Sequence, residues 1–384
     1  MIDSGSFKLS GGPGETITFE VPYQLPETLE ADGEYKLNVF AKLAGDTEYA
    51  KKGYTIASEQ LDIFVEVSHE KADCSAMGDI ACNETDTEIM VTGEMFTVVF
   101  DKASGTLAKF TCNGEDIISS GPVPNFARAP LDNDKTAFEW DKVKSSGAEC
   151  VTVSKSADGK SVTVKTVLKL SSDAGTEEIN YTVYGDGQIT VENKLNPASQ
   201  MGEMHKFGAI MILPGDYENI VFYGNGPEDS YNDRLHGTHL GVWSTTVTDS
   251  FYPYPKPQDT GNKTGVRYFS LSSEDKNTGI LIVAEKEIEA SALHYTVEKM
   301  KAAQYVYTMG QNKDFTYLNI DYGSRGTGGA SCGPDTLSRY CLYNDGRDYS
   351  YTYTIVPYDK SEEDIDTLFR TWHDVDSMTA DDID

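Results

Sequence analysis

Apolar and polar residues alternate along much of the chain. The segments Glu15–Tyr23, Glu34–Leu43 and Ser58–Val67 each place large apolar residues at every second position, as Ile17 and Phe19 show in the first. Successive side chains of a strand point to opposite faces, so this period of two predicts strands that are buried on one side only.

The first 68 residues therefore predict an incomplete β-sandwich. Three or four strands in this length are typical of part of an immunoglobulin-like fold, which has about seven strands. Residues 69–87 contain few large apolar side chains and are predicted to be a linker.

Residues 88–359 repeat strand and turn. Lys160–Leu170 and Ser350–Tyr358 alternate, and Glu177–Leu195 is a hairpin candidate that turns at a Gly-Asp-Gly sequence. No regular alternation of strand and helix occurs, which excludes a (β/α)8 barrel. The pattern predicts an all-β protein whose larger domain is an antiparallel two-sheet sandwich.

Residues 360–384 are predicted to be an acidic tail with one short helix. Ser361 and Asp364 have the spacing of a capping box, and Leu368 and Trp372 would then share a helical face.

Charge and targeting patterns narrow the function classes. The 384 residues carry a formal net charge of −30 at pH 7. Such a surface repels nucleic acids and anionic membranes but accepts neutral ligands such as sugars. No apolar run of about 18 residues occurs, so no membrane span is expected. The N-terminus lacks a basic region followed by an apolar one, so no signal peptide is expected.

The cysteines predict free thiols and favour a cytoplasmic location. None forms a Cys-x-x-Cys pair, and no Cys/His cluster has zinc spacing, so no metal site is expected. The six are Cys74, Cys82, Cys112, Cys150, Cys332 and Cys341.

Three segments carry candidate chemistry, and each has two interpretations. Asn125–Asp134 is rich in Asp and Asn but lacks EF-hand spacing, so it is a calcium loop or a structural one. Tyr223–Arg234 contains Gly-x-Gly without a following helix pattern, which favours an ordered turn over a dinucleotide site. His236 and His239 form a surface pair or an acid or metal site. These residues alone indicate a β-rich, ligand-binding protein.

Five motifs together resemble the C-terminal third of the family 2 β-galactosidases. They are "RAPLDND", "GNGPEDSYNDR", "PYPKPQDTGNKTGVR", "LNID" and "GTGGASCGP", in the family's order and spacing. The segment from Gly33 to Phe64 also resembles the second half of the immunoglobulin-like domain that precedes this region in the family. The resemblance covers nearly the whole chain apart from the acidic tail.

The resemblance implies a fold and a role. Residues 88–359 would form the family's small-chain supersandwich, similar to the galactose mutarotase fold. The catalytic carboxylates of the family, which hydrolyse lactose with retention, lie on an upstream (β/α)8 barrel. The region would therefore hold no catalytic residue and no cofactor, any divalent metal would belong to the barrel, and the isolated chain would be inactive. Its partners would be a β-galactoside sugar, its own barrel and further copies in a homo-oligomer.

The resemblance also assigns residues. A loop residue of the family that contacts the sugar maps onto Cys332, with Gly329 and Ser331 beside it at the rim of the active site. The alternative is that Cys332 is merely small and fits a packed turn. Eight further residues of the family's motifs would hold loops in place by buried ion pairs and hydrogen bonds. These are Arg128, Asp132, Asp134, Tyr231, Asp233, Arg234, Asn262 and Arg267.

The sequence departs from the family's pattern at several polar contacts. Ala127 replaces an aromatic residue or Thr, Asn225 replaces Arg, and Lys263 and Gly265 replace Arg and Asp. The segment Asp229–Tyr231 replaces Glu-Asn-Tyr. These changes affect the expected substrate preference more than the fold.

Two other functions remain open from the sequence. A stand-alone carbohydrate-binding module would use tyrosines and polar loops to bind pyranose rings. A mutarotase-like epimerase would need a histidine acid and a carboxylate base, and none of the six histidines lies in a motif for that chemistry.

Overall fold

A computed structural model describes residues 2–27, 34–63, 76–134, 138–310, 313–329 and 333–371. The chain divides into two compact units, Met1–Lys71 and Ala72–Asp384. In the described part of the chain, no helix is long and apolar enough to cross a membrane.

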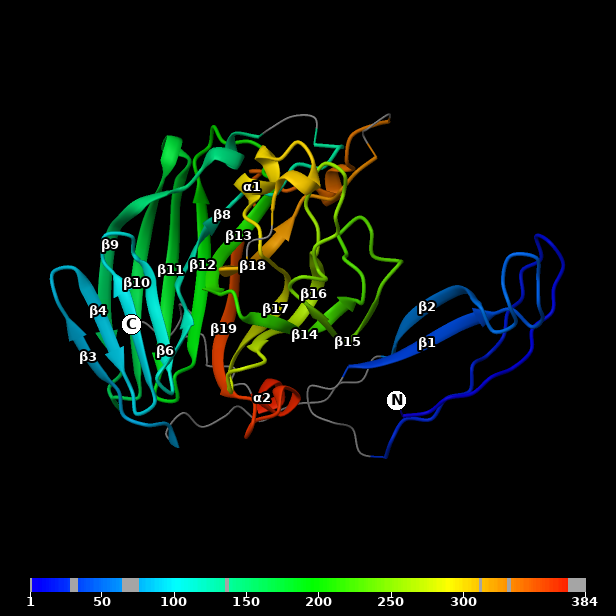
Figure 1. The fold of residues 1–384 in the computed structure, drawn as a ribbon, viewed down its shortest axis with the longest axis horizontal. Helices are drawn as coiled ribbons and strands as arrows, with labels where there is room; N and C mark the ends of the chain where they lie inside the picture. Colours follow the sequence, from blue (N-terminus) through cyan, green and yellow to red (C-terminus); the bar gives the residue numbers. More distant parts are fainter. Residues whose placement is uncertain are drawn as a thin grey trace. The chain divides into compact units, whose positions relative to one another are not determined.

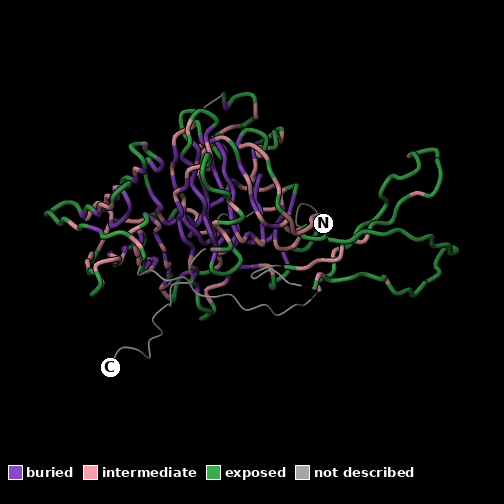
Figure 2. The backbone as a smooth tube through the Cα atoms, turned by 90° about the horizontal axis from the view of Figure 1, so that it is seen from below, coloured by how far each residue is buried: buried purple, intermediate pink, exposed green. Residues whose placement is uncertain are grey.

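The first unit contains one antiparallel hairpin. β1 (Tyr35–Lys42) pairs with β2 (Thr55–Ile63). The strand expected over Glu15–Tyr23 does not form, and Phe19 is 41% exposed. The alternation is present there, but no strand among the described residues pairs with its backbone. Most described residues of this unit are exposed (Figure 2).

The second unit is built around a large antiparallel sheet of twelve strands (Figure 1). Its main path follows the order β15-β14-β16-β17-β19-β12-β11-β10-β9, and β13 pairs with both β8 and β18. The strands are β8 (Ser120–Asn125), β9 (Ser145–Lys155), β10 (Ser161–Leu170), β11 (Gly175–Tyr184), β12 (Ile189–Pro197), β13 (Lys206–Pro214), β14 (Tyr217–Gly226), β15 (His239–Thr246), β16 (Lys263–Ser273), β17 (Thr278–Leu293), β18 (Phe315–Ser324) and β19 (Tyr349–Asp359).

A five-stranded antiparallel sheet packs on the large one. Its order is β3-β4-β5-β6-β7, and apolar side chains from both sheets share one core. Phe100 and Tyr181 meet across this core with ring centroids 5.1 Å apart. The strands are β3 (Ala81–Glu84), β4 (Glu88–Thr92), β5 (Phe96–Asp101), β6 (Thr106–Cys112) and β7 (Glu115–Ile118). β3 lies within the range that the sequence predicted as a linker.

The all-β prediction is confirmed, and the long strands are close to their predicted positions. Lys160–Leu170 forms β10 and Ser350–Tyr358 forms most of β19. The predicted hairpin is β11 and β12, whose connection contains Gly187 with φ = 91°. The positive φ explains why a glycine occurs in this turn.

Among the residues that the structure describes, the helices are few and short. The α-helices are α1 (Val297–Ala302) and α2 (Ile365–Thr371). There are also short 3-10 turns, namely η2 (Glu139–Lys142), η3 (Ser171–Asp173), η4 (Val306–Thr308) and η5 (Ser338–Tyr340).

The predicted tail helix begins later than its expected cap. Asp364, not Ser361, caps α2 by accepting a hydrogen bond from the backbone N–H of Thr367 at 3.0 Å. Leu368 packs against a small apolar cluster that includes Tyr268, and Trp372 lies outside the described residues. Ser361 instead donates its hydroxyl hydrogen to Asp359.

Candidate functional site

Strand order brings distant segments together at one edge of the large sheet. β8 and β18 both pair antiparallel with β13, so they run parallel to each other and end at the same edge. The chain after β8 carries Arg128 and Asp134, and the chain after β18 begins the glycine-rich loop, residues 325–335. His205 directly precedes β13 at this edge.

Arg128 and Asp134 form a buried ion pair with two hydrogen bonds. Nε and Nη2 of Arg128 donate to Oδ2 and Oδ1 of Asp134 at 3.0 and 2.8 Å, and the side chains are 0% and 2% exposed. The N–H of Leu131 also donates to Asp134. Burial opposes ionisation, but the hydrogen bond and charge of Arg128 hold the pKa of Asp134 below its usual value. Asp134 is therefore anionic at neutral pH.

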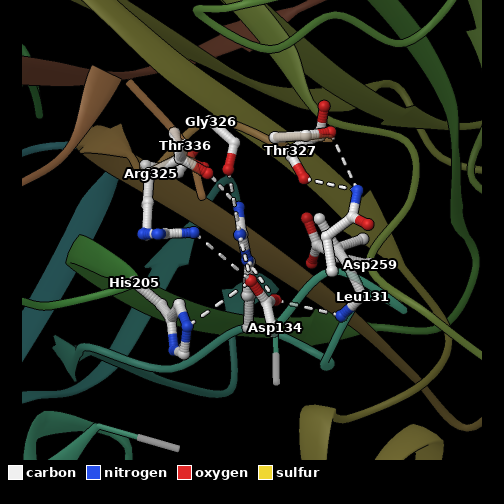
Figure 3. A network of polar contacts seen from close by, with 12 residues as sticks. Leu131, Asp134, His205, Asp259, Arg325, Gly326, Thr327 and Thr336 are labelled. Carbon is white, nitrogen blue, oxygen red and sulfur yellow. Dashed lines mark hydrogen bonds and ion pairs between the residues drawn. The ribbon is translucent and has the colours of Figure 1, made fainter. Parts of the chain in front are cut away.

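Arg128 also fixes the start of the glycine-rich loop. Its Nη1 donates to the carbonyl oxygen of Arg325, and its Nη2 donates to that of Gly326 at 3.3 Å. Figure 3 shows Asp134, Arg325 and Gly326 gathered in this network. A buried guanidinium needs acceptors for its five N–H groups, and a buried loop backbone needs donors for its carbonyls. The two requirements satisfy each other here.

Arg325 joins the two ends of the same loop. Its Nε donates to Glu203 at 2.6 Å, and its Nη2 donates to Asp335 at 2.7 Å. Its guanidinium carbon also lies 5.7 Å from the ring centre of Phe138. Although burial acts against it, hydrogen bonds to both carboxylates raise the pKa of Arg325 above its ordinary value. The base of the loop is thus closed by a permanent cation.

Asp233 and Asn133 hold the next two peptide groups. The N–H groups of Thr327 and Gly328 donate to the two carboxylate oxygens of Asp233 at 2.9 and 2.7 Å. Asn133 Nδ2 donates to the carbonyl oxygens of the same two residues, at 2.8 Å each. Donors and acceptors of the loop backbone are therefore both engaged by side chains from two other loops.

The contacts explain two of the glycines. A Cβ on Gly326 would lie 2.6 Å from Cγ of Asp233, so no side chain fits there without moving the carboxylate. Gly328 has φ = 65°, and a Cβ would overlap the hydroxyl of Thr336. Gly329 is exposed, with open space around its Cα. The loop is tightly held at its base and free at Gly329.

The loop after β14 is fixed by its own contacts. The hydroxyl of Tyr231 donates to Asp259 at 3.0 Å. Arg234 pairs with Asp229 at 3.1 Å, and its guanidinium lies over the Tyr231 ring. Asn232 donates to the carbonyl oxygen of Ser324, which connects this loop to the end of β18.

The other three residues of the predicted set differ in their surroundings. Asn262 is buried and donates to Glu289 Oε2 at 2.9 Å. Arg267 forms an ion pair with Glu287 at 2.8 Å. The Asp132 side chain is exposed, and its backbone N–H donates to a neighbouring loop.

A second buried charge cluster lies on β13, β17 and β18. Lys206 Nζ is 2.8 Å from Asp321 Oδ2, with exposed fractions of 4% and 0%. Burial raises the pKa of Asp321 to about 7 and raises that of Glu289, although Lys206 acts in the opposite direction on both. Ser324 donates its hydroxyl hydrogen to Glu289 at 2.6 Å.

Two cavities open near this edge. The smaller, about 130 Å³, is lined by Arg128, Asp134, Asp141 and His205 among others. His205 Nδ1 lies 2.8 Å from Asp141, and its Nε2 lies 3.5 Å from Asp134. This volume is below the roughly 300–1,000 Å³ of ordinary ligand pockets.

The larger cavity, about 440 Å³, lies between the sheet and α1. Its lining includes Asn125, Ile210, Tyr317 and the Lys144–Glu298 ion pair. The carboxyls of Asp321 and Glu289 line neither cavity. Within the described ranges, no group of three or more His, Cys, Asp or Glu side chains could hold a metal ion.

The structure tests only part of the predicted rim. Ser331 and Cys332 lie outside the described residues, so their side chains are not placed. Gly329, next to them, is exposed. Sequence reasoning missed Arg325, Glu203 and Asn133, which hold the loop base. Asn133 was identifiable as part of the "PLDND" motif, whereas the Arg325–Glu203 pair spans 122 positions and leaves no local pattern.

The fold and the site define an all-β protein with a glycine-rich loop at one edge of its large sheet. Side chains from other loops hold the base of this loop by hydrogen bonds. Residues 92–355 match the family model of the β-galactosidase small chain, and residues 1–64 match that of β-galactosidase domain 4. The first match covers more than half of the chain, so the chain belongs to the β-galactosidase small-chain family. The predicted resemblance is confirmed.

Individual relatives agree with the family match. The β-galactosidase of Priestia megaterium (strain DSM 319 / IMG 1521) is 28% identical, covering 93% of this chain and 35% of that protein. That of Lactobacillus delbrueckii subsp. bulgaricus is 30% identical, covering 86% and 32%. The chain thus spans about a third of the length of these relatives. Among solved structures, the GalM/aldose epimerase homologue from C. elegans is similar, with 13% identity, a TM-score of 0.40, and coverage of 73% of this chain and 99% of that one.

Proposed function

We propose that this chain is the C-terminal part of a β-galactosidase that hydrolyses terminal β-D-galactosides, such as lactose, with retention. In this proposal another part of the enzyme supplies the catalytic carboxylates. This region shapes the rim of the active site and contributes to contacts with its own catalytic barrel and with further subunits. The names of the relatives support the glycosidase class.

One observation carries the rim role. The base of the glycine-rich loop is fixed by the buried Arg128 and by Asp233, while Gly329 beyond it is exposed with open space around it. A loop that positions a sugar contact needs a rigid base and a free tip, because misplacement of a contact by about 1 Å can cost about a hundredfold in rate. Gly329, Ser331 and Cys332 are the residues proposed to form the rim.

The absence of catalysis from this region is also part of the proposal. A retaining glycosidase needs two carboxyl groups about 5–5.5 Å apart with room for a sugar between them. Burial raises the pKa of two carboxyls, Asp321 and Glu289, at the sheet edge that carries the glycine-rich loop (the loop edge). Both side chains are buried and line neither cavity. They are therefore assigned a structural role.

A direct assay tests the assignment. The purified chain should not hydrolyse o-nitrophenyl β-galactoside, because it would lack both carboxylates. Turnover that survives repurification and disappears in the Asp321→Asn or Glu289→Gln variant would contradict the proposal, since it would place the catalytic groups within this chain.

A chimera tests the rim. The chain would replace the matched region of the Priestia megaterium β-galactosidase, with Cys332→Trp as the test variant and Cys150→Trp as the control, because Cys150 is exposed. We expect Cys332→Trp to change KM for lactose while the control leaves it unchanged. Equal kinetic constants for both variants would exclude Cys332 from the rim.

A further inference from the structure

Four tyrosines are gathered on two neighbouring loops of the second unit. Tyr252 and Tyr254 follow β15, and Tyr305 and Tyr307 belong to the turn at η4. The exposed fractions are 60% for Tyr252, 43% for Tyr305 and 78% for Tyr307. Single exposed aromatic residues are common, but a cluster of them marks an interaction surface. We call these four residues the tyrosine platform.

The two loops are held side by side. The N–H of Val306 donates to the carbonyl oxygen of Pro255 at 2.9 Å. Val306 lies between Tyr305 and Tyr307, and Pro255 directly follows Tyr254, so this bond joins the two loops. Phe251 and Met309, the residues that flank the platform, pack on the same buried apolar cluster. The platform therefore has a fixed backbone although three of its four tyrosines, all but the half-buried Tyr254, are exposed.

The rings themselves are paired. Tyr305 and Tyr307 lie with centroids 5.4 Å apart and planes within 6° of parallel. Tyr252 and Tyr254 are 4.6 Å apart. The hydroxyl of Thr308 donates to the carbonyl oxygen of Tyr305, which tightens the turn that carries the parallel pair. Binding to rings that are already ordered costs less conformational entropy than binding to free side chains.

The chemistry of this surface favours one class of ligand. The C–H faces of pyranose rings are flat and weakly apolar, so they pack on the electron-rich faces of aromatic rings, while phenolic hydroxyls can bond sugar hydroxyls. The net charge of −30 disfavours anionic ligands such as acidic polysaccharides. A neutral sugar chain fits both conditions.

We propose that the tyrosine platform is a non-catalytic binding surface for neutral oligosaccharides built of pyranose units. It consists of residues outside the glycine-rich loop and would hold a sugar chain by stacking rather than by enclosing it. The inference does not depend on the rim role of Cys332, because the platform consists of described residues in other loops.

The test is a binding experiment with the full chain. Lactose, a neutral β-1,4-galactotetraose and the anionic tetra-galacturonate would be titrated by calorimetry and saturation-transfer NMR. We expect saturable binding of the neutral tetrasaccharide, weaker binding of lactose and none of the acidic one. The variant Tyr305→Ala/Tyr307→Ala should weaken binding at least about fivefold.

Matched variants separate stacking from other effects. Tyr307→Phe keeps the ring and should retain most of the binding, whereas Tyr307→Ala alone should lose part of it. Tyr49→Ala is the control, because Tyr49 lies in the first unit and is 73% exposed, against 78% for Tyr307. Thermal melting of each variant confirms that these surface changes leave the fold intact.

Three outcomes would overturn the proposal. They are no binding of neutral sugars by the unaltered chain, undiminished binding by Tyr305→Ala/Tyr307→Ala, and a concentration-dependent dimer that this variant abolishes. The last result would show that the platform contacts a second copy of the chain. The binding experiment does not measure hydrolysis, so a negative result would not contradict the proposed β-galactosidase function. A negative result in the hydrolysis or chimera assays would likewise not contradict sugar binding by the tyrosine platform.

Discussion

Buried charged groups are paired at the loop edge, whereas a buried carboxyl in the interior between the two sheets has no hydrogen-bond partner among the described residues. At the loop edge, Arg128 meets Asp134 and two backbone carbonyls. In the interior, Glu177 on β11 is fully buried, and both of its carboxyl oxygens lack a hydrogen-bond partner among the described residues. Burial alone raises the pKa of Glu177 to about 8.

Similar burial therefore produces opposite pH dependence of stability at Asp134 and at Glu177. The pKa of Asp134 is lower in the folded chain than its usual value, so its stabilising contribution exists above that usual value and is lost as pH falls through the folded pKa. The pKa of Glu177 is raised from 4.5 to about 8, so stability declines as pH rises through this interval. The sign of the pKa shift of a buried carboxyl therefore depends on whether a cation is paired with it, not on burial alone.

The largest effect is expected when the paired charge at the loop edge loses its partner. Arg128→Met leaves the buried Asp134 with only the more distant Arg325, 3.9 Å away, as a cation. It also removes the donors to the carbonyl oxygens of Arg325 and Gly326. We expect a loss of about 3–5 kcal/mol in the free energy of unfolding, measured by urea denaturation at pH 7. Arg234→Met removes a half-exposed surface cation instead and should cost less than about 1 kcal/mol. Equal losses of stability in Arg128→Met and Arg234→Met would show that the buried ion pair contributes no more to stability than the exposed one.

Glu177, the unpaired carboxyl of the interior, should make the folded chain less stable as pH rises, the reverse of the effect of Asp134. Glu177→Gln cannot ionise, so this variant should lack a stability decline of up to ~1.4 kcal/mol per pH unit that the unaltered chain shows between about pH 4.5 and pH 8. The measurement is urea denaturation at several pH values. Glu178→Gln, on the exposed face of the same strand, is the control. Parallel pH profiles for all three proteins would mean that Glu177 is ionised in the folded state.

A smaller effect tests the packing of the loop base. Gly326→Ala places a methyl group against the Asp233 carboxylate, so we expect a loss of about 1–3 kcal/mol. Hydrogen exchange at the amides of Thr327 and Gly328 should accelerate, because these amides donate to Asp233. Gly329→Ala meets open space and should change neither quantity. Unchanged exchange in Gly326→Ala would show that the loop base tolerates movement.

The smallest effect on stability is expected at Asp335, the exposed partner of Arg325 at the base of the glycine-rich loop. Asp335 is 73% exposed, whereas Glu203, the other partner of Arg325, is 16% exposed. Asp335→Asn should therefore lower stability by less than about 0.5 kcal/mol, and the change should vanish at high salt. Glu203→Gln should cost more and depend less on salt. Melting curves at two salt concentrations distinguish the variants, and a reversed order would contradict the burial argument.

The sequence predicted the sheets better than the contacts between loops. Alternation identified β10, in which every second residue is buried, and β19, which alternates in its first half and is buried on both faces in its middle. The same alternation in Glu15–Tyr23 was misleading, since period alone does not provide a pairing partner. The tail cap was misplaced by three residues because Ser361 bonds Asp359 instead.

The candidate site depended on the family resemblance. The motifs named Arg128, Asp134 and Asp233, but their partners could not be derived from spacing. Arg128 bonds residues 197 and 198 positions away, and that proximity follows from the pairing of β8 and β18 with β13. Long-range strand order is set by the whole core rather than by any local pattern.

The same strand order has a consequence for biosynthesis. Arg128 leaves the ribosome long before Arg325, 197 residues later, whose carbonyl it needs. At about 5–20 residues per second, this interval lasts roughly 10–40 s. β13 ends at Pro214 and β18 begins only at Phe315, so in the later part of this interval β13 can pair with β8 but not with β18. One side of β13 then remains an open edge on the nascent chain. The loop edge is therefore completed late, and a chain released before β18 is made would expose that edge to pairing with other chains.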